Sequence, residues 1–406
     1  MKYFLLLACL VIINSGCQNN SKTMERTFRD DVAFLQKYTD AMVLKEPGGK
    51  GQIIVVPQYQ ARIMTSSLAG EDGAGFGWIN YDHIASGIVD ARFNAYGGED
   101  RFWLGPEGGQ FSLYHKMGGP FDLGNWFVPK QIDTQPFNVE ESSGQHVRMS
   151  SDFYISNYSE SKFKVHIDRT VRIFTVAEIS KNLGVKNFDN CELVGFESVN
   201  VMTNTDSKDW DKSSGLISIW VLGMFNPGDN VVITLPYYQG GIGSLGEVVN
   251  TDYFGEIPSE RIRSSQGIVY FSGDGKFRSK IGLSWMRAKK TFGSYDPDRK
   301  VLTLIKFNKP EEEAEYIKAK WEIMDDPYNG DVVNSYNDGS PGPGQEPLGP
   351  FYELETSSPV KELKPGEQIE HIHQTYHIKG KENELSHITE KLFNVTIQEI
   401  QDAFKH

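Results

Sequence analysis

The feature that most limits the fold of this chain is a long succession of short apolar segments separated by turn-forming residues. More than a dozen such segments follow one another after residue 52, and several alternate apolar and polar residues, as in FKVHIDRTVRIFTV (163–176). Alternation with a period of two is typical of half-buried β-strands. The stretches between them, such as NPGDN (226–230) and YNDGSPGPG (336–344), carry the residues that tight turns require. The sequence therefore predicts an all-β chain.

The number of predicted strands selects among the all-β architectures. A propeller would show a repeat of about 40 to 50 residues, which the sequence lacks. A jelly roll has only about eight strands. A large antiparallel sandwich of two sheets remains. Because no low-complexity linker interrupts the strands, residues 51–406 are predicted to form a single domain.

Helices are predicted at a few places only. Residues Thr23–Leu44 form the clearest one, since apolar side chains recur there at steps of three and four: Phe28, Val32, Leu35, Tyr38 and Met42. This helix and a tether fill residues 17–50 and lie outside the sandwich. Two short helices are predicted at Val176–Asn182 and Glu311–Lys320, and a last strand at 388–398.

The N-terminus has the pattern of a secretory signal. Lys2 precedes an apolar run at 4–13, and the small residues SG lead directly to Cys17. The apolar run is too short to span a bilayer. Small residues before a cysteine resemble a bacterial lipobox, which implies removal of residues 1–16, a lipid on Cys17 and a place in the cell envelope, periplasmic or surface-facing. The alternative is an ordinary signal peptide with an incidental cysteine.

The charge of the chain argues against nucleic acid as a partner. The net charge is −13 and the isoelectric point is about 5.3. Such a balance repels a phosphate backbone.

One block, Tyr96–Lys116, mixes glycines, charges and aromatic rings more densely than a turn or a core strand requires. Arg101 offers a fixed fork of donors for hydroxyls or a carboxylate. Trp103 can stack on a sugar ring, and Glu107 follows a proline in a turn. These three are candidate sugar contacts. The structural alternative is that Arg101 pairs with Glu107 while the rings fill the core.

The segment EHIHQTYHI places His371, His373 and His377 on one face of a strand. Three imidazoles on one face permit zinc binding, a general acid near neutral pH, or a strand without a catalytic role. Glu353, on a strand that also carries Glu355, could supply the carboxylate of an acid/base pair with His371 or His373. Glu107 and Glu353 could instead act as the two carboxylates of a glycoside hydrolase.

A third candidate segment, at 326–344, is rich in oxygen-bearing side chains. Four of them could take calcium, although their spacing is not that of an EF-hand: Asp331, Asn334, Asn337 and Asp338. A loop at the sheet rim that holds Asn334 and Tyr336 over a sugar is a second interpretation. A turn in which these side chains bond to their own backbone is the third.

Three blocks together resemble the galactose mutarotase-like superfamily, in an uncharacterised bacterial lipoprotein branch: YGGEDRFWLGPEGGQF (96–111), GDGKFRSKIGL (273–283) and YELETSSPVKELKPGEQIEHIHQTYHI (352–378). The resemblance implies a β-supersandwich that binds carbohydrate on a concave sheet. Mutarotases use a histidine as acid and a glutamate as base, and this chain has no clean copy of their histidine motif.

We therefore expect a carbohydrate-active protein of the cell envelope that acts on a sugar by acid/base chemistry, through epimerisation or bond cleavage. A non-catalytic carbohydrate-binding lipoprotein is the alternative. No cofactor other than calcium is expected. The residues expected to share one pocket are Arg101, Trp103, Glu107, Glu353, His371 and His373, with Asn334 and Tyr336 at its rim.

Overall fold

The structure is a computed structural model that describes residues 26–405 except 187 and 189. Cys17 and the proposed signal lie outside the described residues. The chain folds mainly into β-structure, and every pairing between its named strands is antiparallel. The prediction of a mostly β fold built on large antiparallel sheets is therefore confirmed.

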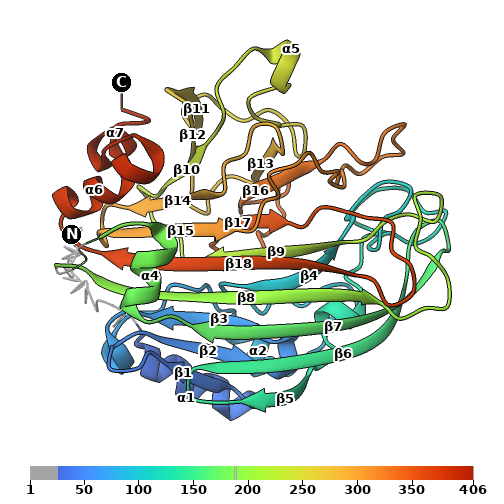
Figure 1. The fold of residues 1–406 in the computed structure, drawn as a ribbon, viewed down its shortest axis with the longest axis horizontal. Coiled ribbons are helices and arrows are strands. Elements are labelled where there is room, and N and C mark those ends of the chain that lie inside the picture. Colours follow the sequence, from blue (N-terminus) through green and yellow to red (C-terminus); the bar gives the residue numbers. More distant parts are fainter. Residues whose placement is uncertain (1–25, 187, 189, 406) are drawn as a thin grey trace, which may run out of the picture.

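The largest sheet has ten strands, and Figure 1 shows them side by side, with β11 and β5 at opposite edges. In spatial order they are β11 (Ile262–Ser265), β12 (Ile268–Ser272), β10 (Val232–Pro236), β14 (Thr291–Asp296), β15 (Val301–Phe307), β18 (Gln368–Lys379), β8 (Glu192–Asn204), β7 (Lys162–Ile173), β6 (His146–Ser156) and β5 (Asn138–Ser142).

A second sheet of five strands packs against the first. Its order is β13 (Ser279–Ser284), β16 (Asp331–Asn337), β17 (Tyr352–Ser357), β9 (Ser218–Phe225) and β4 (Arg101–Gly105). A third, smaller sheet consists of β1 (Met42–Lys45), β2 (Gln52–Val56) and β3 (Arg62–Ser67). Because β1 pairs with β2, a domain boundary at residue 50 would divide this small sheet.

The alternation of residues along each strand builds the core between the two large sheets. In β7, alternate residues such as Phe163, Val165 and Ile167 are buried, and the intervening ones are half-buried or exposed. They share one apolar cluster with Phe102 of β4 and Val221 of β9. Burying this apolar surface between the sheets is the main stabilising contribution to the sandwich.

Seven α-helices and two 3₁₀ turns accompany the sheets in the described part of the chain. They are α1 (Phe28–Tyr38), α2 (Tyr81–Ser86), α3 (Lys130–Asp133), α4 (Val176–Leu183), α5 (Ile242–Leu245), α6 (Glu382–Phe393), α7 (Ile397–Gln401), η1 (Pro57–Tyr59) and η2 (Gly70–Asp72). Figure 1 shows α6 and α7 at one end of the large sheet and α1 beside β1. None of the described helices is long and apolar enough to cross a bilayer.

Two predicted helices are present. Helix α1 begins after the N-cap Thr27 and is shorter than predicted, because Met42 and Leu44 belong to β1 instead. Pairing with β2 takes precedence there over the helical spacing. Helix α4 begins after the N-cap Thr175, which forms a capping box with Glu178.

Two other predictions at this level were wrong. Glu311–Lys320 forms no helix, because Tyr316 is buried in the core and pairs with Asn329. Residues 388–398 form no strand but the end of α6 and the start of α7. Asn394, at a positive φ of 63°, separates these two helices, and Thr396 caps the second.

Candidate functional site

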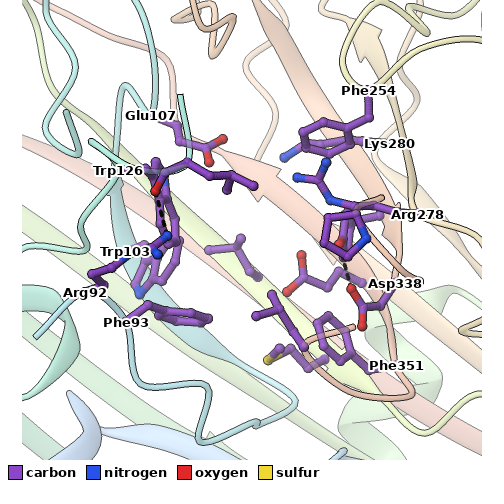
Figure 2. Close-up of a pocket in the computed structure, with 18 of the residues that line it drawn as sticks. Arg92, Phe93, Trp103, Glu107, Trp126, Phe254, Arg278, Lys280, Asp338 and Phe351 are labelled. Carbon is purple, nitrogen blue, oxygen red and sulfur yellow. Dashed lines mark hydrogen bonds between the residues drawn. The ribbon is translucent and has the colours of Figure 1, made fainter. Parts of the chain in front are cut away.

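A cavity of about 480 Å³ lies on the outer face of the five-stranded sheet, away from the ten-stranded one. Its floor comes from all five strands: Arg101 and Trp103 (β4), Trp220, Leu222 and Met224 (β9), Glu353 (β17), Tyr336 (β16) and Lys280 (β13). Loops supply the walls, which include Glu107, Trp126, Phe254, Arg278, Trp321 and Phe351. Figure 2 shows the side chains converging on the space between Glu107 and Asp338. Its volume falls in the range of small-molecule sites.

Strand register explains why residues so far apart in sequence meet here. Lys280 pairs with Tyr336, Tyr336 with Glu353, and Glu353 with Met224, so these four side chains form one row across the sheet. Side chains at directly paired positions share a face. Because successive side chains of a strand point to opposite faces, the residues between these positions point into the core. Leu354, between Glu353 and Glu355, belongs to an apolar cluster inside the sandwich.

Aromatic rings dominate the cavity walls. Four of the seven tryptophans of the chain line it: Trp103, Trp126, Trp220 and Trp321. The rings of Trp103 and Trp220 meet edge to face at 5.7 Å, and those of Trp126 and Trp321 are stacked at 6.4 Å. Within the described residues, the indole N–H of Trp103 has no hydrogen-bond partner. The cavity walls thus present flat apolar faces.

Two buried ion pairs hold the cations of the floor. Arg101 donates to Glu353 at 2.6 Å, and the Arg101 guanidinium carbon lies 4.2 Å from the Trp103 ring centre. Lys280 donates to Glu355 at 3.0 Å, and Glu355 also accepts the indole N–H of Trp220 at 3.0 Å. These contacts hold the acidic and basic groups in fixed orientations.

The carboxyl groups at the cavity have perturbed acidity. Burial raises the pKa of Glu107; Lys280 opposes this shift and Glu355 reinforces it. Burial also raises the pKa of Glu353, with Arg101 acting against it and Glu355 with it. Burial alone would lower the pKa of Lys280, but Glu355, Glu107 and Glu353 raise it. Carboxyls with raised pKa values beside a cation are the groups that can hold and transfer a proton near neutral pH.

A second charged group lies on the opposite wall. The guanidinium of Arg278 stacks on the ring of Phe254 at 3.7 Å. Beside it, Asp338 accepts hydrogen bonds from the hydroxyl of Tyr336 at 2.7 Å and from the backbone N–H of Gly349 at 2.9 Å. Figure 2 shows Arg278 and Asp338 on the wall that faces Trp103 and Trp126.

The structure brings part of the predicted site together. Arg101, Trp103, Glu107, Glu353 and Tyr336 all line the cavity. Arg101 pairs with Glu353 and not with Glu107. The aromatic rings of the block Tyr96–Lys116 divide between the two faces of the sheet: Phe102 points into the core and Trp103 lines the cavity.

The expectation that His371 and His373 line this pocket was wrong. Both are buried, at 1% and 0% exposure, on the inner face of β18. Nε2 of His371 and Nδ1 of His373 lie 2.7 and 2.8 Å from the hydroxyl of Thr356. Since Thr356 follows Glu355 in β17, its side chain lies on the other face of the strand from the cavity. The five-stranded sheet itself separates the histidines from Glu353.

The lowered pKa values of His371 and His373 agree with their burial in the core. Burial lowers the pKa of His371 to about 3, helped by His373, and lowers the pKa of His373 to about 4, where Asp100 acts in the opposite direction. Both rings are neutral at pH 7. The third histidine, His377, bonds to Glu99 at 2.9 Å, and the three therefore do not converge on one point.

The interpretation of Asn334 and Tyr336 as part of a rim loop was also wrong, since both lie within β16. Asn334 does not line the cavity; its amide donates to the hydroxyl of Tyr253 at 2.9 Å, and Tyr253 donates to Asp331 at 2.6 Å. Asn337 instead bonds to Asp274, away from Asp331. The four candidate calcium ligands are thus not gathered around one point, and the described residues contain no group of three or more His, Cys, Asp or Glu that could hold a metal.

Sequence reasoning missed several cavity residues. Lys280 and Arg278 lie in the block GDGKFRSKIGL, and their positive charges two residues apart are the signal that could have marked them. Trp126, Trp220 and Trp321 stand in three separate segments of the chain, and only the fold gathers them.

Comparisons with known proteins concern the fold and the family. A putative aldose 1-epimerase from Escherichia coli K12 aligns with a TM-score of 0.48 and 9% identity, over 84% of this chain and 100% of that one. A galactose mutarotase-like protein from Lactobacillus casei aligns with a TM-score of 0.46 and 13% identity, over 83% and 99%. A putative mutarotase from Salmonella typhimurium aligns with a TM-score of 0.45 and 10% identity, over 85% and 92%.

Among curated proteins the search found no match. A family described as a family of unknown function, DUF6786, matches residues 26–404, which is nearly the whole described part of the chain. The chain belongs to this family of unknown function, DUF6786.

Proposed function

We propose that this chain binds a sugar in the cavity on the five-stranded sheet and acts on it by acid/base chemistry. The observation that carries the proposal is that four tryptophans, the Arg101–Glu353 ion pair, Lys280 and the half-buried Glu107 line one cavity. Aromatic faces stack on the apolar face of a sugar ring, while fixed donors and acceptors orient its hydroxyls. The proposal rests on this geometry.

Glu107 is the residue that we assign to proton transfer. Its carboxyl is half-buried at the cavity wall, and burial raises its pKa. A raised pKa keeps a proton available at a pH where an exposed glutamate has lost it. Glu353, oriented by Arg101 at 2.6 Å, lies in the floor of the same cavity and is the candidate proton acceptor. Proton exchange at an anomeric centre and cleavage of a glycosidic bond both require such a pair.

The second candidate is a binding protein without chemistry. The observation that favours it is that Glu353 and Glu355 are both engaged in ion pairs, with Arg101 and Lys280. Carboxylates held in this way can position a ligand without exchanging a proton. The two candidates differ only in whether Glu107 acts on a bound sugar.

Binding can be tested with a matched pair of tryptophan variants. Trp321 lines the cavity and Trp285 does not, while both are half-buried. Calorimetric titration with a panel of mono- and disaccharides should find a ligand whose affinity falls about 10-fold or more in Trp321→Ala, from the loss of a stacking contact. Trp285→Ala should bind as the wild type does. If no sugar binds, or if both variants bind equally well, the proposal is wrong.

Catalysis can be tested with Glu107→Gln, which retains the shape of the side chain. We expect this variant to bind the sugar and to lose anomeric exchange or cleavage, as followed by NMR of the bound substrate. A wild-type protein that binds a sugar and leaves it unchanged would instead support the binding-protein candidate.

A location in the cell envelope is part of the proposal and rests on the sequence around Cys17. Cys17→Ala should move the protein from the membrane fraction to the soluble fraction. A variant that stays with the membranes would show that the anchor is not at Cys17.

A further inference from the structure

Arg278 differs from the other buried or half-buried cations of the cavity in having no acidic partner. Arg101 pairs with Glu353 and Lys280 with Glu355. Arg278, which lines the same cavity, makes no ion pair or hydrogen bond within the part of the chain that the structure describes. Its contact is the face of the Phe254 ring, 3.7 Å from the guanidinium carbon.

The acidic group on the same wall, Asp338, does not take the place of such a partner. Asp338 accepts the hydroxyl of Tyr336 and the backbone N–H of Gly349; Arg278 is one of the charges that lower its pKa, but within the described residues the two form no ion pair or hydrogen bond. Glu107 lies across the cavity, and Arg278 acts on it through space, as one of the charges that lower its pKa. The fork of N–H donors on Arg278 is therefore available to a ligand.

Phe254 fixes the direction of that fork. Stacking on an aromatic face holds a guanidinium in one plane, and Phe254 is itself held edge to face against Tyr336 at 5.9 Å. A planar fork in a fixed position matches the two oxygens of a carboxylate or a phosphate. A neutral ligand that covered Arg278 would desolvate its charge without neutralising it, which is unfavourable.

We propose that the cavity takes an anionic sugar, and that Arg278 binds its acidic group. This inference rests on the proposed function and names its substrate class. A carboxylate, as in a uronic acid, and a phosphate, as in a sugar phosphate, present the same oxygen geometry to Arg278. The aromatic wall formed by Trp103 and Trp126 then receives the sugar ring on the opposite side of the cavity.

The test compares charged and neutral forms of the same sugars. Glucuronate, galacturonate, glucose 6-phosphate, glucose and galactose are titrated into the wild-type protein by calorimetry. We expect one anionic class to bind on the order of 10- to 100-fold more tightly than the matching neutral sugar, the range of a charge-assisted hydrogen-bonded contact. Affinity for the anion should fall with added salt, whereas affinity for a neutral sugar should not.

Variants assign the effect to Arg278. Arg278→Gln should reduce anion affinity by about the same 10- to 100-fold and abolish the preference for the anionic over the matching neutral sugar. Arg148→Gln removes an arginine that pairs with Asp168 outside the cavity, and it should bind as the wild type does. Because Arg278 is only half-buried, the variant is expected to fold, which circular dichroism and urea unfolding verify.

The outcomes separate this inference from the proposed function. Tighter binding of uronates identifies a carboxylate ligand, and tighter binding of the sugar phosphate identifies a phosphate ligand; either supports the inference. Neutral sugars that bind as well as anionic ones, with no effect of Arg278→Gln, overturn the inference and leave the proposed function standing. A protein that binds none of these sugars, nor any of the wider saccharide panel, overturns both.

Discussion

Replacing Thr356 by valine tests the polar contact that joins the two large sheets beneath the cavity. The hydroxyl lies 2.7 Å from Nε2 of His371 and 2.8 Å from Nδ1 of His373. All three residues are almost completely buried. One hydroxyl can serve both rings, because it donates its proton to one nitrogen and accepts the N–H of the other.

The expected loss of stability follows from these contacts. Thr356→Val keeps the shape of the side chain and removes both hydrogen bonds. Each buried nitrogen left without a partner costs about 1 to 3 kcal/mol, and the added methyl group restores about 0.8 kcal/mol of apolar burial. We expect the free energy of unfolding to fall by about 3 kcal/mol in total. Urea unfolding followed by tryptophan fluorescence measures the change from the midpoint and the slope.

Thr375 in β18 provides the matched control. It is also fully buried, and within the described residues its hydroxyl has no hydrogen-bond partner. Thr375→Val should therefore be neutral or stabilising. If Thr356→Val loses no more stability than Thr375→Val, the bridge between the sheets contributes nothing and our reasoning is refuted. Sugar affinity should be unchanged in both variants, and a 10-fold loss in folded Thr356→Val would return the histidines to the functional site.

Three further predictions concern charged and titrating groups. His371 and His373 have folded-state pKa values lowered to about 3 and about 4, below the 6.5 of an ordinary histidine, so the stability that depends on their neutral form is present above about pH 6.5 and is lost as the pH falls. Each of these two histidines should lower the free energy of unfolding by roughly 3 kcal/mol at pH 4 relative to pH 7. In urea unfolding, His373→Gln should therefore lose less stability between pH 7 and pH 4 than the wild type. The control His387→Gln, which changes an exposed histidine, should lose as much stability as the wild type. Arg169→Met leaves Asp100, which is fully buried and 2.5 Å from Arg169, without its partner; the free energy of unfolding should fall by about 3 to 5 kcal/mol, and a loss below about 1 kcal/mol would contradict this. Arg101→Gln should weaken sugar binding by about 1.5 to 3 kcal/mol in calorimetry, and unchanged affinity would show that Arg101 only orients Glu353.

Much of the fold could be predicted from local patterns. The alternation in β7 gives its buried face directly, and the capping residues Thr175 and Glu178 mark the start of α4. The wrong strand prediction at 388–398 came from a short apolar run whose spacing fits a strand as well as a helix. In the structure, Ile388 and Phe393 are buried residues of helix α6.

The site could be predicted only in part. Arg101, Trp103 and Glu353 stood out because charged and aromatic residues in a strand need an explanation. The alternation of side chains along a strand correctly placed the three histidines on one face, but alternation does not show which face of the strand points into the core. That depends on the pairing of β18 with β8 and β15 and on the sheet packed against it, which are long-range contacts that the sequence does not display.

The row of paired positions that crosses the five-stranded sheet has a consequence for how this protein can change. Outward positions such as Glu353 and Lys280 can be replaced to alter the chemistry of the cavity while Leu354 and its inward neighbours maintain the fold. Insertions are different. One extra residue within β17 would turn the two glutamates inward, toward neutral histidines, and bring Leu354 and Thr356 to the cavity. Substitution can therefore diversify this site, whereas a change in strand length would disable the site and the core together.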